Sequence, residues 1–520
     1  MLRLRLSQLS DHPLDDRHKR AALLDDFSRI ASLAVLNEIS AYLDAVTTSR
    51  HVNAIVAFDI VDFLDRAGAR VQQRLAEEFL GSSHDADQYH QGRLWIAAST
   101  YWARLAAAYR ICLRDAPESS TPELHSYLPR IICRALRACS LQLKWSYLRH
   151  GPVPPKLWYD FAELYRIAEQ LGLAHAVTQV YPTSESTAER EFLAGMMLAV
   201  SSADALTSSQ IEIVDRIVAQ LASHFQLSAQ PGPGAFYVMD RSGRGSPGRF
   251  SETRRANQNL LCFGPSGAIS QIQQMSQFID QTSSVPPELI VPTDTDVAFV
   301  YRTLLHLLRY WSLTQPERKQ PRRRHSERIG VVHGYEAVVA GVSGSFHESL
   351  DVSNEEEWTI EDESDGGFGA FVPNTRGAWI ELGRLIGVRR EEGVSWGAGV
   401  VRRITLDEDE NCSVGIEMLA SGGSVVTIRS APQKGNRRGS ALLPQGELCV
   451  LLGAGGSNAF ELTLLMRANV FSYSEELLMY AYDHQYLLLP MRLLEHGAEF
   501  DVVRYRIIEQ HGYVARHETS

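Results

Sequence analysis

The sequence has few cysteines and no long hydrophobic run. Its six cysteines lie far apart along 520 residues, and none forms a C-x-x-C pair. This spacing is typical of reduced thiols in a cytoplasm rather than of a disulfide framework. No stretch approaches the roughly 18 apolar residues that a membrane-spanning helix needs. Residues 1–20 also lack the apolar core of a secretion signal. We therefore expect a cytoplasmic protein without a membrane span.

The sequence also lacks the short motifs of common enzymes. It contains no G-x-S-x-G, no G-x-x-x-x-G-K-[ST] and no paired carboxylates that indicate catalysis. Residues 84–90 (HDADQYH) carry metal-capable side chains without ligand spacing, and residues 453–457 (GAGGS) are typical of a hairpin turn. We predict no enzyme activity, no cofactor and no metal site. An enzyme whose site lies in the helical half is an alternative that no local motif supports.

An excess of acidic residues limits the kinds of partner. The 51 Lys and Arg residues against 62 Asp and Glu residues give a formal net charge of −11. Proteins that coat nucleic acid polymers depend on many contacts between basic side chains and phosphates, so we expect no such partner. A single local anion site is still compatible with this charge. The segment that needs an explanation is RRRHSER, which places four arginines in seven residues: Arg322, Arg323, Arg324 and Arg328.

Hydrophobic spacing divides the chain into four parts. Residues 1–227 carry apolar residues at helical spacing and predict a helical domain. Residues 228–259 are rich in Gly, Pro, Ser and Arg, which is typical of a linker or long loop, with one short strand at residues 235–240. Helical patterns return at 266–279 and 296–313. We therefore predict that residues 228–317 are a linker plus a helical segment.

The C-terminal two fifths have a β texture. Residues 329–420 contain six short, β-branched segments separated by glycines, with no helix predicted between them. This pattern predicts a small antiparallel barrel over residues 318–422. Further strand patterns predict a second β module over residues 423–520. The expected fold class is a multidomain α + β protein: a helical N-terminal region, then a six-stranded antiparallel barrel, then a C-terminal β module.

Two short motifs in the predicted barrel have complementary chemistry. The spacing of Arg324 and Arg328 would align them on one face of a helix or turn, where guanidinium groups can hold phosphates and stack on purines. Asp362, Ser364 and Gly367 fit D-x-S-x-x-G. A carboxylate can accept both donors of a guanine edge, a serine can donate to an oxygen, and glycine permits a tight turn or close approach of a ligand. Together these residues describe a guanine nucleotide site without catalytic parts.

At these residues the sequence resembles the PilZ domain family. That family carries R-x-x-x-R before the first strand and (D/N)-x-S-x-x-G one strand later, on a six-stranded barrel. Here the motifs are RHSER at residues 324–328 and DESDGG at residues 362–367, and the resemblance covers residues 318–422. RKQPR at residues 318–322 also fits the first motif. The interval between the two motifs is longer than is usual in the family, and its carboxylates would weaken anion binding by repulsion.

The resemblance implies a bacterial receptor for cyclic di-GMP. In this family the residue before R-x-x-x-R helps to decide between one ligand and a mutually intercalated pair, and Arg323 leads us to expect a pair. We expect the ligand to order the arginine segment, to rearrange the domains and so to regulate a protein partner that the sequence does not identify. Arg402 and Arg403 could add a phosphate contact or be an exposed strand pair, and Trp396 could stack on a base or be core. The alternative is a structural or adaptor protein whose PilZ-like barrel does not bind ligand.

Overall fold

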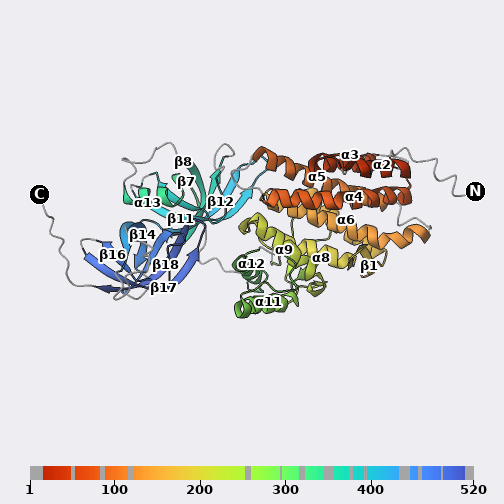
Figure 1. The fold of residues 1–520 in the computed structure, drawn as a ribbon. Coiled ribbons are helices and arrows are strands. Elements are labelled where there is room, and N and C mark those ends of the chain that lie inside the picture. Colours follow the sequence, from red (N-terminus) through yellow and green to blue (C-terminus); the bar gives the residue numbers. More distant parts are fainter. Residues whose placement is uncertain are drawn as a thin grey trace, which may run out of the picture. The chain divides into compact units, whose positions relative to one another are not determined.

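The chain forms two compact units, Met1–Glu317 and Arg318–Ser520 (Figure 1). None of the helices in the described ranges combines the length and apolar character needed to cross a membrane. The six cysteines are free and buried. The computed structural model describes residues 14, 16–27, 29–48, 53–81, 88–114, 122–251, 259–292, 295–314, 323–344, 355–373, 379–391, 393, 395–431, 446–454, 460–481 and 484–509.

The first unit is mainly helical, which confirms the predicted helical N-terminal region. The helix at Ser208–Gln220 begins with a capping box: the Thr207 hydroxyl accepts from the Gln210 amide at 3.3 Å, while the Gln210 side chain accepts from the Thr207 amide at 3.1 Å. The helices are α2 (Arg17–Phe27), α3 (Ser32–Thr48), α4 (Ala54–Gly81), α5 (Gln88–Cys112), α6 (Pro122–Leu148), α7 (Pro155–Gln170), α8 (Ala188–Ala199), α9 (Ser208–Gln220), α11 (Ala268–Thr282) and α12 (Val297–Tyr310), with short 3-10 turns at Ala203–Ala205 and Ala222–His224.

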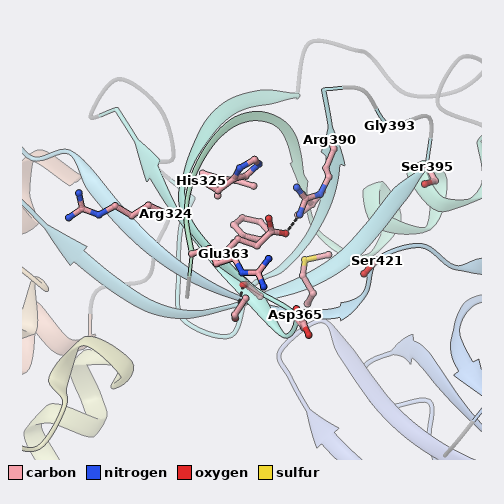
Figure 2. A pocket seen from close by; sticks show the side chains of 15 residues that line it. Arg324, His325, Glu363, Asp365, Arg390, Gly393, Ser395 and Ser421 are labelled. Atoms are coloured by element: carbon pink, nitrogen blue, oxygen red, sulfur yellow. Dashed lines mark hydrogen bonds and ion pairs between the residues drawn. The ribbon is translucent and has the colours of Figure 1, made fainter. Parts of the chain in front are cut away.

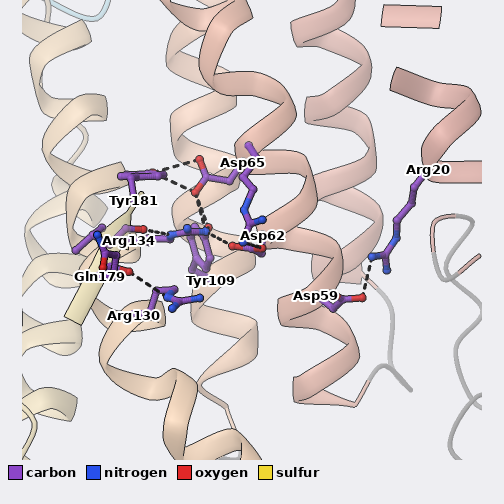
Figure 3. Close-up of polar contacts among 11 residues, drawn as sticks. Arg20, Asp59, Asp62, Asp65, Tyr109, Arg130, Arg134, Gln179 and Tyr181 are labelled. Atoms are coloured by element: carbon purple, nitrogen blue, oxygen red, sulfur yellow. Dashed lines mark hydrogen bonds and ion pairs between the residues drawn. The ribbon is translucent and has the colours of Figure 1, made fainter. Parts of the chain in front are cut away.

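A buried polar network attaches a hairpin to these helices (Figure 3). The hairpin consists of β1 (Thr178–Tyr181) and β2 (Ser184–Ser186). Tyr109 and Tyr181 donate to the Asp65 carboxylate at 2.5 and 3.1 Å, and Arg134 Nε donates to the Val180 carbonyl at 2.8 Å. Asp65 and Arg134 are each only 2% exposed. Such buried charges persist in a fold because each has a partner of opposite charge and hydrogen bonds.

Residues 228–317, which we expected to contain a linker, carry a small sheet. Its strands are β3 (Gln226–Ser228), β4 (Tyr237–Asp240), β5 (Gly248–Arg249) and β6 (Leu260–Gly264), in the order β3-β6-β4-β5. Tyr237 and Phe263 belong to the same buried cluster as the helical core. The described part of this segment is therefore packed structure, although its Gly- and Ser-rich composition is typical of a linker. Aromatic side chains between the turns are buried and pack this segment, which the overall composition does not reveal.

The second unit begins with the predicted six-stranded antiparallel barrel. Its strands close in the order β10-β11-β12-β9-β8-β7, around a core that includes Ile329, Trp358, Phe368 and Val414. The strands are β7 (Arg323–His333), β8 (Glu356–Ser364), β9 (Gly367–Val372), β10 (Leu385–Arg390), β11 (Trp396–Leu406) and β12 (Cys412–Ala420).

One prediction about this barrel is wrong: a helix, α13 (Tyr335–Ser343), separates the first two strands. The valines of this segment are typical of a strand, but Gly334, at φ +89°, ends β7, and Gly344, at φ +74°, caps the helix. Val338 and Val339 are buried in a cluster shared with both barrels. Tertiary burial therefore overrides the β propensity of these residues.

The C-terminal β module is a second closed barrel. Its strands are β13 (Ser424–Ser430), β14 (Glu447–Ala454), β15 (Glu461–Arg467), β16 (Leu477–Ala481), β17 (His484–His496) and β18 (Phe500–Glu509). They pair in the order β13-β14-β15-β18-β17-β16, and β16 closes on β13. Counted within each barrel, the first strand pairs with the second and fourth, and the third pairs with the sixth. The two barrels therefore share one connectivity.

The two barrels pack through their outer faces and through α13. The shared buried cluster combines Val338 of α13 with Val400 of the first barrel and Phe500 of the second. Polar contacts surround it: the Tyr335 hydroxyl donates to the Leu448 carbonyl at 2.7 Å. The strand that carries the arginine motif thus leads directly into the helix that contacts the second barrel.

Candidate functional site at the mouth of the first barrel

The pairing of β7 with β8 brings the two predicted motifs side by side. Arg324 lies opposite Asp362, and Arg328 lies opposite Thr359, with a register shift between these pairs. Both arginines therefore lie within the first strand, not on the helix or turn that we predicted. Four regular strand residues span about 13 Å, at about 3.3 Å each, so the register shift brings their Cα atoms closer than that. The two arginines thus start from different points along the same strand.

Alternation along β7 decides which side chains face the barrel interior. Ile329 and Val331 belong to the buried core, and successive side chains on a strand point to opposite faces. Arg324 and Arg328 therefore share the outer face. Arg323 lies on the same face as Ile329, toward the mouth of the barrel, and it lines a cavity there.

Strand β8 divides its motif between the same two faces. Glu363 pairs with Phe368, whose side chain is in the barrel core, so Glu363 faces inward. Asp362 pairs with Gly369 on one side and with Arg324 on the other, and these directly opposed residues share the outer face. Figure 2 shows Arg324 directed away from the group formed by Glu363 and its neighbours.

The three arginine side chains of the motif have few contacts. The side chains of Arg323 and Arg324 are exposed, and neither forms a hydrogen bond or ion pair with another residue in the described parts of the chain. Arg328 lies 3.4 Å from a Glu357 carboxylate oxygen, and the two side chains are 66% and 59% exposed. Exposed pairs of this kind contribute about 0–1 kcal/mol. Redirecting either arginine to a ligand therefore costs little.

The D-x-S-x-x-G residues fix the β8–β9 hairpin. Asp362 Oδ1 accepts from the Gly369 amide at 3.1 Å, and the Ser364 hydroxyl donates to the Gly367 carbonyl at 3.0 Å. Gly367 has φ +155°, and a Cβ there would lie 2.0 Å from the Ile416 carbonyl oxygen. Close backbone packing alone thus requires glycine at this position. The hairpin in turn orients the Asp362 carboxylate.

A cavity of about 610 Å³ opens at the mouth of the barrel. Arg390, Glu363 and His325 line it and belong to an ion-pair group: Arg390 pairs with Glu363 and Glu327, and His325 lies 3.0 Å from Glu327. Partial burial lowers the pKa of Arg390, but the two carboxylates more than compensate and the pKa is raised. Figure 2 shows Arg390 reaching toward Glu363. Other residues that line the cavity are Arg323, Arg324, Ser364, Asp365, Gly367, Phe368, Val388, Ser395, Met418 and Ser421.

Sequence reasoning did not single out this ion-pair group. The available signal was the alternation of RRHSERI, which places His325 and Glu327 on the same face as Ile329 once the strand is extended back to Arg323. Arg390 could be found only from the pairing of β10 with β7, where it lies opposite Ile329.

The secondary candidates have other contacts. Arg402 pairs with Glu495 of the second barrel at 2.6 Å and with Glu417 at 2.7 Å, so it ties the barrels together. Trp396 is 7% exposed, which leaves its ring little surface for stacking on a base. Arg322, the motif at residues 318–322, most of residues 84–90 and residues 455–457 lie outside the described residues. Within the described ranges, no group of three or more His, Cys, Asp or Glu side chains could hold a metal ion.

Comparison with known families identifies both regions. Residues 18–232 match the family model "Cyclic-di-GMP receptor FimW, N-terminal domain", and residues 347–424 match "Cyclic-di-GMP receptor FimW, middle PilZ domain". No curated protein matches the chain. The second match begins after β7, the strand that carries Arg324 and closes the barrel. Together the two matches cover more than half of the sequence, and the chain belongs to the cyclic-di-GMP receptor family that they describe.

Proposed function

We propose that this chain binds cyclic di-GMP on the outer face of β7–β9 through Arg324, Arg328, Asp362 and Ser364. The observation that carries the assignment is the register that places Arg324 directly opposite Asp362. A guanidinium beside a carboxylate provides complementary groups for a guanine nucleotide. The guanidinium can bind the phosphate or the Hoogsteen edge, and the carboxylate can accept the N1–H and N2–H donors of the Watson–Crick edge.

The spacing of the arginines supports a ligand with two separated anionic groups. Arg324 and Arg328 share one strand face at two separate positions along β7, and Gly367 belongs to the adjacent hairpin. Arg323 lies at the mouth of the barrel, where it can contact a second molecule stacked on the first. We therefore propose a mutually intercalated pair of cyclic di-GMP molecules. A calorimetric ratio near one ligand per chain would contradict the pair and leave the site itself intact.

The proposed output is regulation of a protein partner in a bacterial cytoplasm. Binding would order the start of β7, and β7 leads through Gly334 into α13, which packs on the second barrel. A change in that strand can thus reach the surface of the second barrel through packed residues. The proposed receptor requires no cofactor and catalyses no reaction. The alternative function is that of an adaptor that does not bind ligand. The carboxylates of Glu327, Glu357 and Glu363 beside the site favour this alternative.

Isothermal titration of the full chain with cyclic di-GMP tests the proposal. We expect micromolar or tighter binding, about −8 kcal/mol or better, that is lost in an Arg324→Ala/Arg328→Ala variant. The matched control is Arg492→Ala/Arg506→Ala, which removes the same charge from exposed positions on the second barrel and should bind like the parent. No heat and no thermal shift with the parent protein would support the adaptor instead.

A further inference from the structure

Each motif of the proposed site contains a carboxylate that faces the interior of the barrel, behind the proposed ligand face. Glu327 lies between Arg324 and Arg328, and Glu363 lies between Asp362 and Ser364. Cyclic di-GMP carries two phosphodiester charges, so uncompensated carboxylates here would oppose its approach. The site therefore needs a cation that neutralises these two residues without occupying the outer face.

Arg390 is a cation placed to neutralise both carboxylates from the inner face. It is the last residue of β10, its backbone lies opposite Ile329 of β7, and its side chain pairs with both Glu327 and Glu363. The side chains of Glu327 and Glu363 are 18% and 31% exposed, against 45% for Arg390. One guanidinium thus connects β10 to the two strands that carry the motifs, and it does so from the inner face (Figure 2).

We propose that Arg390 is the positioning residue of this site. It neutralises Glu327 and Glu363 and joins β7 to β8, so that Arg324 is held opposite Asp362 before the ligand arrives. The inference rests on the proposed function. Arginine suits this role because its planar fork of donors can satisfy two carboxylates at once.

The neighbouring arginine provides an internal contrast. Arg389 follows Val388, whose side chain is in the barrel core, so Arg389 points outward. It pairs with Glu355 at 2.6 Å and lies over the Trp396 ring at 5.3 Å. It therefore carries the same charge on the same strand but contacts neither motif. Arg389→Gln is the matched control for Arg390→Gln.

The experiment is calorimetric titration of full-length variants with cyclic di-GMP, with thermal unfolding to establish that each variant is folded. Arg390→Gln should weaken binding by about tenfold or more, the usual effect of losing charged hydrogen bonds. Arg389→Gln should bind within about twofold of the parent, because Arg389 points outward to Glu355 and Trp396 and contacts neither motif. Arg390→Lys should keep most of the affinity, since the charge is preserved.

The decisive variant is Arg390→Gln/Glu327→Gln/Glu363→Gln, which removes the cation together with the two carboxylates it neutralises. A positioning role predicts that this variant regains most of the affinity lost in Arg390→Gln. Loss without recovery would mean that neutralising Glu327 and Glu363 is not the role of Arg390 and would overturn the proposal, as would parent-like binding by Arg390→Gln. Absence of binding by the parent protein would instead overturn the proposed function itself and the role of Arg390 with it.

Discussion

Replacing Arg134 by methionine should destabilise the helical unit strongly. Arg134 is 2% exposed, contacts the Asp62 carboxylate and lies 3.5 Å from Asp65, which is also buried. The methionine fills similar space but leaves Asp65 without its cation. Breaking a buried pair from one side typically costs about 3–5 kcal/mol, because the remaining charge is uncompensated. We expect a loss of that size in the free energy of unfolding.

The loss in the free energy of unfolding should depend on pH, and the titration of Asp65 determines the direction of this dependence. Burial raises the pKa of this carboxyl, while Arg134 and the Tyr109 hydroxyl act in the opposite direction. Between the unfolded value of about 3.9 and the raised folded value, the folded chain binds more protons than the unfolded chain. The free energy of unfolding therefore falls as pH rises through that window. Without Arg134 the folded-state pKa of Asp65 rises further, so this window extends to higher pH. Arg134→Met should therefore lower the free energy of unfolding less at pH 5 than at pH 8.

Urea denaturation of the full chain at both pH values measures the effect, and amide hydrogen exchange at Tyr181 reports on the hairpin itself. Arg130→Met is the matched control, because Arg130 lies one turn earlier on α6 and donates to the Gln179 carbonyl of the same hairpin at 3.1 Å, but is exposed. It should cost about 1 kcal/mol or less. Adding Asp65→Asn to Arg134→Met should recover part of the loss. Equal costs for the two arginines, or the same cost at both pH values, would refute the reasoning.

Two further predictions concern the first barrel. Glu357→Gln should raise the affinity for cyclic di-GMP by up to about fivefold, because it frees Arg328 from an exposed pair of about 0–1 kcal/mol; calorimetry showing weaker binding would contradict this. Gly367→Ala should lower the melting temperature of the chain, since its Cβ would lie 2.0 Å from the Ile416 carbonyl oxygen, whereas Gly366→Ala should be tolerated because a Cβ there meets nothing within 4 Å. Similar melting temperatures for the two variants would argue against a packing requirement for glycine.

The sequence was informative where periodicity and burial agree. The helical region and the six-stranded barrel were predicted because long amphipathic stretches indicate helices and short Gly-bounded β-branched segments indicate strands. The segment of Val338 and Val339 was mistaken for a strand because its burial comes from a second barrel, which local pattern cannot reveal. Of the sheet that contains Tyr237, only the strand at residues 235–240 was predicted, because turn-forming residues surround the other short strands.

The candidate site was predictable as a set of residue types but not as two faces of one strand. We placed the first strand after Arg328, whereas it begins at Arg323, and this shift conceals the alternation that separates outward-facing from inward-facing residues. Arg324 and Arg328 still share a face once β7 includes the motif, because Arg328 alternates with the core residue Ile329 and Arg324 lies opposite the outward-facing Asp362. The intervening Glu327 lies opposite the core residue Ile360 and faces inward, where His325 of β7 and Arg390 of β10 contact it. The ion pair with Arg390 is therefore a consequence of the barrel's closure, since β10 reaches β7 only because the sheet closes on itself.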